Sequence, residues 1–298
     1  MNNIKNVFSI KDLENLSGIK AHTIRIWEKR YNVLAPMRTE TNIRSYDLVN
    51  LQKLLNITLL HNHGYKISQI SKLSEERIPE LANEIISDKS FKHHAISAFK
   101  MAMMNFDQAL FLNTYDKLLS EKPFREIFTD ILIPFLIEVG SLWQTNTISI
   151  AHEHFISYLI KQKLLINTEK LQYKQATKTD TVFILFLPKR EIHELGLLYL
   201  NYEIQLNGYK SIYLGADVPI DSLKDVKKHF DTITYVCYMT VEPNKSVLND
   251  FVKEIRNEVL TDSSKFWAIG RMSENIDSKL TDEKLSIFSS ISEIVEKL

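Results

Sequence analysis

A histidine flanked by a glutamate and a glycine has the residue types and spacing of a metal-ligand site, in the segment Glu191-Ile192-His193-Glu194-Leu195-Gly196. A histidine can bind a metal through one ring nitrogen while a carboxylate accepts a hydrogen bond from the other. Gly196 would let a bulky group approach the backbone closely. The spacing alone is weak, because a lone loop histidine is more often a solvated or capping residue.

The elements around this motif predict a ligand-binding edge of a sheet. The buried-strand run TVFILFLP (181–188) precedes it, and strands and helices then alternate to the end of the chain. Helices are expected at EIHELGLLYLNYEIQLNG, DSLKDVKKHF, near 246–259 and at SEIVEKL, and strands at YKSIYLG, TITYVCYM, KFWAIG and near IFSS. This alternation predicts a five-stranded, parallel, doubly wound sheet of the flavodoxin or Rossmann type. Such sheets bind ligands outside the carboxyl ends of their strands, where the histidine motif lies.

A second group of polar residues lies in a helical region. Residues 79–172 show continuous helical periodicity and predict a bundle of about four helices. Trp143 is followed ten and eleven residues later by Glu153 and His154. Core packing of Trp143 is the alternative interpretation. His152 and His154 are two residues apart, a poor spacing for one metal on one helix face.

The first 75 residues are basic and predict a nucleic-acid-binding module. They hold eleven Lys or Arg against six Asp or Glu, while the rest of the chain holds 26 against 31. Ser9 is a plausible N-cap, Ser17-Gly18 a turn, residues 21–30 a second helix, 36–46 a hairpin and 47–62 a further helix. The candidate DNA-binding residues are Thr23, Arg25, Lys29 and Arg30 on the second helix and Arg38, Thr39 and Arg44 in the hairpin. The alternative is a small helical domain with a solvated basic face.

Composition excludes several classes of protein. No apolar run reaches the roughly 18 residues of a membrane span, so no membrane partner is expected. The chain has one cysteine, Cys237, which excludes an intrachain disulfide and makes a thiolate metal site improbable. No catalytic triad, phosphate-binding loop or paired carboxylates are recognisable. We therefore expect a cytoplasmic protein of 298 residues that is not an enzyme.

The N-terminal pattern resembles the DNA-binding domain of the MerR family nearly end to end, over residues 7–75. The matching residues are Ser17-Gly18, Thr23, Arg25, Trp27-Glu28, Arg30, Pro36, Arg38-Thr39, Arg44, Tyr46 and Gly64. The resemblance implies a winged helix-turn-helix that binds a palindromic operator as a dimer and distorts promoter DNA, with RNA polymerase as a further partner. The segment after residue 75 is not a long heptad run, so we expect a homodimer or higher homo-oligomer formed through the rest of the chain.

The C-terminal pattern resembles cobalamin-binding domains of the methionine-synthase type. Their signature is D/E-x-H-x-x-G, and W-x9-E-H resembles the helical cap of light-responsive cobalamin regulators. The resemblance implies cobalamin, as adenosylcobalamin or methylcobalamin, bound between the helical bundle and the α/β domain. His193 would be the lower cobalt ligand. The other implied cofactor-binding residues are Trp143, Ile150, Glu153 and His154 in the cap, and Glu191, Gly196, Gly215 and Gly270 in the α/β domain.

Three positions depart from the patterns that this chain resembles. Gln144 replaces the histidine that captures cobalt after illumination, so no light-induced second histidine bond is expected. The third strand reads YVCYMTVEP instead of carrying a serine, and Gly270 stands alone where the pattern has two glycines. In the family these features hold the nucleotide tail, so the departures predict weaker tail binding or loss of cobalamin binding.

Together these patterns predict a multidomain α and α/β protein. Its domains are a winged helix-turn-helix over residues 1–77, a helical cap over 78–175 and a cobalamin-binding α/β domain over 176–298. The predicted function is a DNA-binding transcriptional regulator controlled by cobalamin. The alternative is an apo regulator with a degenerate cobalamin fold that senses a protein or another ligand.

Overall fold

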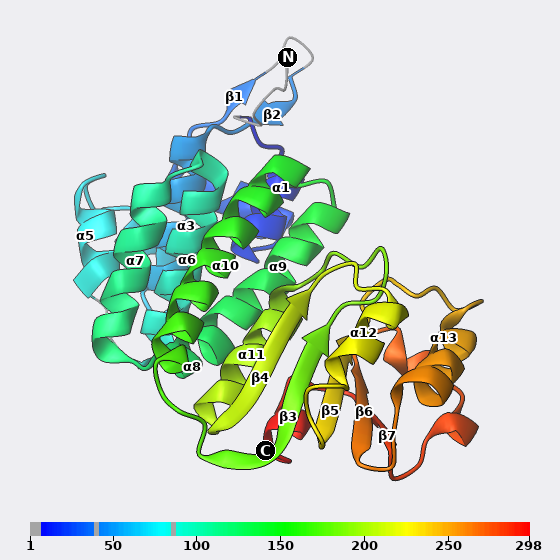
Figure 1. The fold of residues 1–298 in the computed structure, drawn as a ribbon. Helices are drawn as coiled ribbons and strands as arrows, with labels where there is room; N and C mark the ends of the chain where they lie inside the picture. The colour runs from blue at the N-terminus through cyan, green and yellow to red at the C-terminus, as the bar shows by residue number, and fades with distance from the viewer. Residues whose placement is uncertain (1–6, 39–41, 85–87) are drawn as a thin grey trace. The chain divides into compact units, whose positions relative to one another are not determined.

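The computed structural model describes residues 7–38, 42–84 and 88–298 and divides the chain into two compact units, Met1–Ile160 and Lys161–Leu298 (Figure 1). The division falls inside the helix α10 (Ile150–Gln172). The sequence predicted domain boundaries at 77/78 and 175/176, and these boundaries stay predictions.

The first unit begins with a helix-turn-helix. Helix α1 (Ile10–Ser17) starts at Ser9, which forms a capping box with Asp12, and ends at Gly18, as the sequence predicts. Helix α2 (Ala21–Tyr31) follows after a short turn. Two short antiparallel strands, β1 (Met37–Arg38) and β2 (Arg44–Ser45), then form the predicted hairpin. The module ends with α3 (Leu48–Asn62) and α4 (Ile67–Ile70).

The rest of the first unit is the predicted helical bundle. After α5 (Arg77–Glu84), it consists of α6 (Asp88–Asn105), α7 (Gln108–Glu121), the run from α8 (Phe124–Ile127) to α9 (Ile133–Gln144), and α10. A π-helical turn, η1 (Phe128–Leu132), joins α8 to α9 without a break. The ring of Phe99 on α6 lies 5.0 Å from that of Phe111 and 5.7 Å from that of Phe135. These buried aromatic contacts hold three of the helices together.

The second unit is the predicted five-stranded parallel sheet, in the order β4-β3-β5-β6-β7. The strands are β3 (Lys178–Phe186), β4 (Tyr209–Gly215), β5 (Ile233–Tyr238), β6 (Ser264–Ile269) and β7 (Leu285–Phe288). All four strand pairs are parallel. This order reverses direction beside β3, so the loop after β3 lies at the topological switch point.

Helices cover both faces of the sheet, as expected for a doubly wound fold (Figure 1). Helices α11 (Leu195–Leu206) and α14 (Ile291–Val295) pack on one face, where Phe183, Val236 and Trp267 form the core. Helices α12 (Ile220–Val226) and α13 (Leu248–Glu254) pack on the other, and the π turn η2 (Ile255–Val259) extends α13. Two 3₁₀ turns, η3 (Ser273–Asn275) and η4 (Ser278–Leu280), link β6 to β7.

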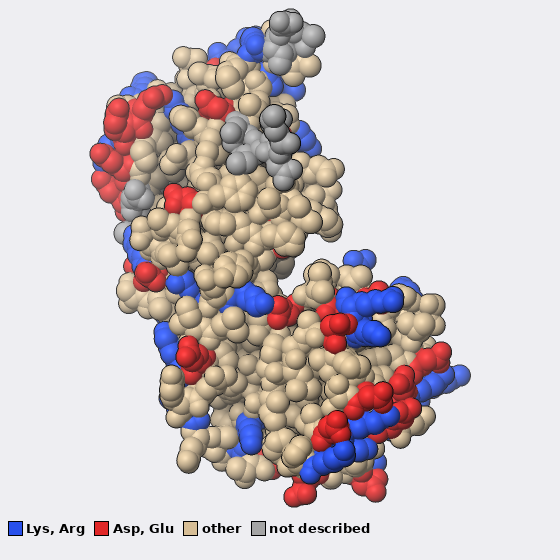
Figure 2. Space-filling view, turned by 45° about the horizontal axis from the view of Figure 1, so that its top comes forward, with Lys and Arg blue, Asp and Glu red and all other residues tan. Residues whose placement is uncertain are grey.

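Acidic and basic side chains interleave on the surface of the second unit (Figure 2). On α12, α13 and η2 they form ion pairs such as Lys224 with Asp221, Lys228 with Asp225 and Lys253 with Asp250. Because positive and negative charges alternate, this surface offers no continuous basic stripe to a phosphate backbone. The basic N-terminal module is therefore the better candidate for contact with nucleic acid.

Candidate functional site

Helix α2 presents a basic face to solvent and an apolar face to its own module. Arg25, Lys29 and Arg30 are exposed. Ile24 and Trp27 are buried, and the Trp27 ring meets the His61 ring of α3 edge-on at 5.1 Å. The three basic side chains are therefore free to reach a ligand, while the apolar pair fixes the orientation of the helix. Thr23, the fourth candidate on this helix, is half-buried.

The hairpin beside α2 is held by the partly buried carboxylate of Glu28. The Arg44 Nε donates to Glu28 Oε1 at 2.9 Å, and the Tyr46 hydroxyl donates to Glu28 Oε2 at 2.9 Å. Burial raises the pKa of Tyr46, and the hydrogen bond to Glu28 raises it further. Glu28 thus joins the recognition helix to strand β2. The sequence pattern contained Glu28 but gave no sign of this positioning role.

The remaining hairpin candidates are distributed differently. Arg38 is exposed on β1, and its Nη1 donates to Asn42 Oδ1 at 2.6 Å. Thr39 lies outside the described residues. Because Arg44 is engaged by Glu28, its first effect is to fix the hairpin against α2. Arg38 is the hairpin arginine that points to solvent and can meet a phosphate oxygen.

At the carboxyl end of β3, the Glu191 carboxylate holds two loops together. Its Oε2 accepts hydrogen bonds from the backbone N–H groups of Thr240, Val241 and Glu242 at 3.0, 2.7 and 3.0 Å. The carboxylate is 1% exposed. Burial by itself would raise the pKa of Glu191, but the backbone N–H groups and the His193 ring lower it to about 2. Glu191 is therefore an ionised anchor that ties the loop after β3 to the loop after β5.

The same carboxylate orients His193. Glu191 Oε1 lies 2.5 Å from His193 Nδ1 and also accepts the backbone N–H of His193 at 3.0 Å. An ionised carboxylate can only accept, so Nδ1 carries the proton of this hydrogen bond, and Nε2 is the ring nitrogen left for another partner. The His193 side chain is 54% exposed. The carboxylate therefore fixes the direction of the imidazole, which is the arrangement that the sequence suggested for a metal ligand.

Glu194 fixes the start of the helix that follows His193. It forms an ion pair with Lys161, and the Tyr213 hydroxyl donates to Glu194 Oε2 at 3.1 Å. Burial raises the pKa of Tyr213 and so keeps this phenol protonated as a donor. The His193 loop is therefore anchored on both sides, by Glu191 before it and Glu194 after it.

The glycines of the predicted site are packed against this chain. A Cβ on Gly196 would lie 2.5 Å from the Tyr238 ring, and a Cβ on Gly270 would lie 2.5 Å from the Met239 carbonyl oxygen. Gly215 ends β4 with φ +87°, a conformation that L side chains rarely adopt. The close approach that Gly196 permits is thus made by Tyr238, which the sequence pattern did not single out. Ligand contact by these three glycines remains a prediction.

The four cap candidates lie at the end of α9 and the start of α10 in the first unit. Trp143 and Ile150 are 50% and 58% exposed. Glu153 Oε1 accepts a hydrogen bond from Ser157 at 2.7 Å, and the His154 side chain is 69% exposed. Trp143 is therefore not a core residue, which argues against the packing alternative. These side chains are accessible to a ligand.

The two neighbouring histidines have different surroundings. His152 is buried, and its ring stacks on Phe106 with centroids 4.6 Å apart. Its Nδ1 lies 2.8 Å from the Ser149 hydroxyl. His152 therefore packs inside the bundle while His154 faces solvent. Among the described residues, no group of three or more His, Cys, Asp or Glu side chains could hold a metal ion on its own.

The loop between α9 and α10, which separates Trp143 from the other cap candidates, contacts the helix-turn-helix. Asn15 on α1 donates its side-chain N–H to Thr147 Oγ1 at 2.9 Å, and Thr147 is fully buried between α9 and α10. Lys100 on α6 donates to the Leu16 carbonyl oxygen at 3.0 Å and pairs with Glu138 on α9. None of these contacts could be predicted from the sequence, because the partners are separated by 38 to 132 positions and no local pattern marks them.

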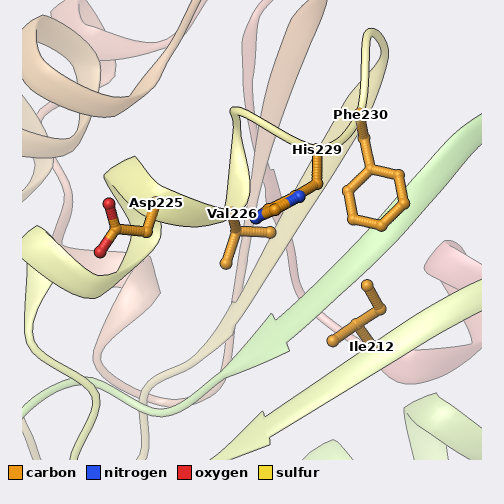
Figure 3. A pocket seen from close by; sticks show the side chains of 5 residues that line it. All are labelled: Ile212, Asp225, Val226, His229 and Phe230. Carbon is orange, nitrogen blue, oxygen red and sulfur yellow. The ribbon is translucent and has the colours of Figure 1, made fainter.

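A shallow hollow of about 540 Å³ lies elsewhere in the second unit, beside β4 and the end of α12 (Figure 3). Ile212, Val226 and Phe230 form its apolar wall, and the His229 ring lies between Val226 and Phe230. The nearby Asp225 pairs with Lys228, which lowers the pKa of Asp225. Among the residues that the structure describes, no hydrogen bond from a carboxylate fixes His229 as Glu191 fixes His193.

Comparison with known proteins defines the class of the chain. Residues 8–77 match the family model of the MerR HTH family regulatory protein, and residues 95–166 match that of the B12 binding domain. The second match spans the bundle with Trp143, Glu153 and His154. The helix-turn-helix, the bundle and the parallel sheet thus define a DNA-binding regulator with a cobalamin-binding module. The chain thus combines a MerR-type helix-turn-helix with a B12-binding module, the arrangement of a DNA-binding transcriptional regulator.

Two curated relatives agree with this assignment. The chain is 27% identical to the HTH-type transcriptional repressor CarH of Myxococcus xanthus over 222 residues, which is 72% of this chain and 73% of the relative. It is 24% identical to the HTH-type transcriptional repressor CarA of the same organism over 250 residues, 82% of each chain. The monomethylamine corrinoid protein of Methanosarcina barkeri aligns with a TM-score of 0.57 at 17% identity, over 71% of this chain and 98% of that one. This last likeness shows a shared fold.

Among the helices that the structure describes, none has both the length and the apolar composition needed to cross a membrane.

Proposed function

We propose that this regulator represses transcription and that cobalamin, held through His193, controls its affinity for DNA. The observation that carries the proposal is the contact between the helix-turn-helix and the loop of the cap candidates, Asn15 to Thr147. Because that loop lies between Trp143 and Ile150, a ligand that moves the cap moves a direct hydrogen-bond partner of α1. Repression is the function in the names of both curated relatives.

The chemistry of the His193 loop fits the lower face of a corrinoid. A bound corrinoid would supply a cobalt ion that is already held by the corrin ring, so the protein would need to provide few metal ligands of its own. One imidazole with a free Nε2 suffices for this, which agrees with the absence of a larger ligand cluster among the described residues. Glu191 holds the proton on Nδ1 and makes the imidazole a better donor.

The exposed cap residues suit the other side of the ligand. We propose that Trp143 and Ile150 provide apolar contact for an upper ligand, with Glu153 and His154 beside them as polar partners. The upper ligand is adenosyl or methyl. Gln144 offers only an amide oxygen to cobalt, so control is expected to depend on the presence of ligand and not on a light-induced second histidine bond.

For DNA binding, we propose that Arg25, Lys29 and Arg30 enter the major groove or contact its phosphates. Thr23, Arg38 and Thr39 would bind the flanking sugar-phosphate backbone. Arg44 acts through Glu28 and the position of the hairpin. The operator is a palindrome read by a homodimer or higher homo-oligomer, with RNA polymerase as a further partner. Oligomer contacts are expected outside the short helix α5.

Salt dependence tests the DNA assignment. Arg25→Ala, Arg30→Ala and Arg38→Ala should each reduce the slope of log K against log salt by about one unit, because each removes one phosphate contact. Fluorescence anisotropy with an operator duplex measures the slope. Lys245→Ala, which removes an exposed charge from the second unit, should leave it unchanged. Unchanged operator affinity at moderate salt after joint replacement of Arg38 and Arg44 by alanine would show the hairpin assignment to be wrong.

A second experiment tests the contact with the cap loop. Adenosylcobalamin should change operator affinity of the parent protein by roughly 5- to 150-fold, the usual range of coupling between two sites. Asn15→Ala combined with Thr147→Val should reduce that change to less than about threefold, since both polar ends of the contact are removed. Anisotropy titrations with and without the ligand give the ratio, and Asn62→Ala on α3 is the matched control. A full response in the double variant would argue against this route.

A specific observation favours a second candidate function, an apo regulator that senses a protein or another ligand. Gly196 and Gly270, predicted to face cobalamin, are packed against Tyr238 and Met239 of the chain itself. The cobalt content and absorption spectrum of protein purified after incubation with adenosylcobalamin and methylcobalamin discriminate the two. Stoichiometric cobalt supports the cobalamin regulator, whereas cobalt-free protein that still binds its operator supports the apo regulator.

A further inference from the structure

The space between the start of α11 and the end of the sheet is filled by one aromatic side chain. Tyr238 is the last residue of β5, and its side chain lies on the face of the sheet covered by α11. A Cβ on Gly196, in the first turn of α11, would lie 2.5 to 2.8 Å from three atoms of the phenol. Only a residue without a side chain can stand at Gly196 while this ring is in place.

The ring is partly buried and packs against the core of this face. It contacts the cluster that contains Leu197, Val236 and Ile269, and burial raises the pKa of the phenol. Gly270, directly after β6, is closed in the same way, because a Cβ there would lie 2.5 Å from the carbonyl oxygen of Met239. The Tyr238 side chain thus occupies the space beside Gly196, and the backbone of the next residue, Met239, occupies the space beside Gly270.

This packing matters for the part of a cobalamin that hangs below its corrin. A cobalamin held through His193 would bring its base, ribose and phosphate to the side of the corrin that faces the protein. Tyr238 fills the space beside Gly196, three residues after His193. The tail would therefore find no room between this ring and the start of α11.

The neighbouring groove does not attract the tail either. A groove of about 540 Å³ lies at the carboxyl ends of β3, β4 and β5. Its charged lining residues are two cations and four carboxylates: Lys189, Arg190, Asp221, Glu242, Asp250 and Glu254. A phosphodiester placed there meets more negative than positive charge.

We infer that Tyr238 makes this protein select its ligand by the corrin ring and not by the nucleotide tail, so that tail-free corrinoids of the cobinamide type are full ligands. The inference rests on the proposed function, since it requires cobalt coordination by His193. It assigns Tyr238 as a specificity-determining residue. The packing of Tyr238 against Gly196, which also favours an apo regulator, would in this case distinguish corrinoids with a nucleotide tail from those without one.

The test compares aquocobinamide with hydroxocobalamin by isothermal titration calorimetry and absorption spectroscopy on the full chain. The parent protein should bind cobinamide at least as tightly as hydroxocobalamin, with the spectrum of imidazole coordination in both complexes. Tyr238→Ser should increase affinity for hydroxocobalamin at least about tenfold relative to cobinamide, because it opens the space beside Gly196. Tyr238→Phe keeps the ring and should behave like the parent.

Each outcome has one meaning. Cobinamide binding by Tyr238→Ser, at parent affinity, shows that the variant is folded and makes its hydroxocobalamin affinity interpretable. If the Tyr238→Ser variant does not fold, the affinities of the parent and of Tyr238→Phe still test the inference. A parent protein that binds hydroxocobalamin tenfold or more tightly than cobinamide overturns it. An unchanged ratio in a folded Tyr238→Ser also overturns it. Binding of neither corrinoid by the parent contradicts the proposed function itself, a result distinct from binding with the wrong preference.

Discussion

Replacing His193 with alanine is expected to weaken cobalamin binding by more than about 100-fold. Replacing a residue that only hydrogen-bonds to a metal ligand usually lowers metal affinity by roughly 10- to 100-fold, and loss of the ligand itself should cost more. The physical reason is the loss of the proposed cobalt ligand, His193 Nε2, whose ring is held in place by Glu191. Calorimetry gives the affinity. The absorption spectrum should lose the signature of imidazole coordination, a change that a general loss of stability would not produce.

The matched control is His229→Ala, which removes an imidazole from the hollow beside β4 in the same unit. It should leave affinity and spectrum as in the parent protein. Circular dichroism should show that His193→Ala keeps the fold, because the His193 side chain is half exposed. If His193→Ala binds cobalamin with the parent's affinity and spectrum, the axial assignment is wrong and the motif is a solvated loop histidine after all.

Replacing Glu191 with alanine is expected to have the largest effect on stability, about 3–5 kcal/mol. A buried hydrogen-bond donor left without a partner costs about 1–3 kcal/mol. This substitution removes the acceptor of the N–H groups of Thr240, Val241 and Glu242 together. Water that enters the opened loop is expected to recover part of the loss. Urea unfolding followed by circular dichroism measures the change.

Glu191→Gln separates the two roles of this carboxylate. It keeps the shape but replaces one acceptor oxygen by a donor, so we expect an intermediate loss of stability together with a 10- to 100-fold loss of cobalamin affinity. Glu254→Ala, an exposed carboxylate on α13, should change the free energy of unfolding by less than about 0.5 kcal/mol. A Glu191→Ala protein as stable as the parent would refute the anchoring role.

Local patterns in the sequence were sufficient to predict most of the helices and strands. The N-cap at Ser9, the helix end at Gly18 and the hairpin at 36–46 depend on interactions between residues close in the chain, and all three are present. The alternation of buried runs with amphipathic ones predicted the five parallel strands for the same reason. The hydrogen bond between Glu191 and His193 could also be predicted, because the two partners are two residues apart.

Only the tertiary structure decided what surrounds these local features. Glu191 also binds the N–H groups of residues 240–242, about fifty positions away, and Asn15 meets Thr147 across 132 positions. The sequence predicted that Gly196 leaves space for a ligand, but the Tyr238 ring fills that space. This contact could not be predicted locally, because β5 and α11 meet only when the sheet has formed. Spacing within one element follows from fixed backbone geometry and can be read from sequence. Which side chain fills the space between two elements depends on how the whole sheet and its helices pack, and a single sequence does not encode that locally.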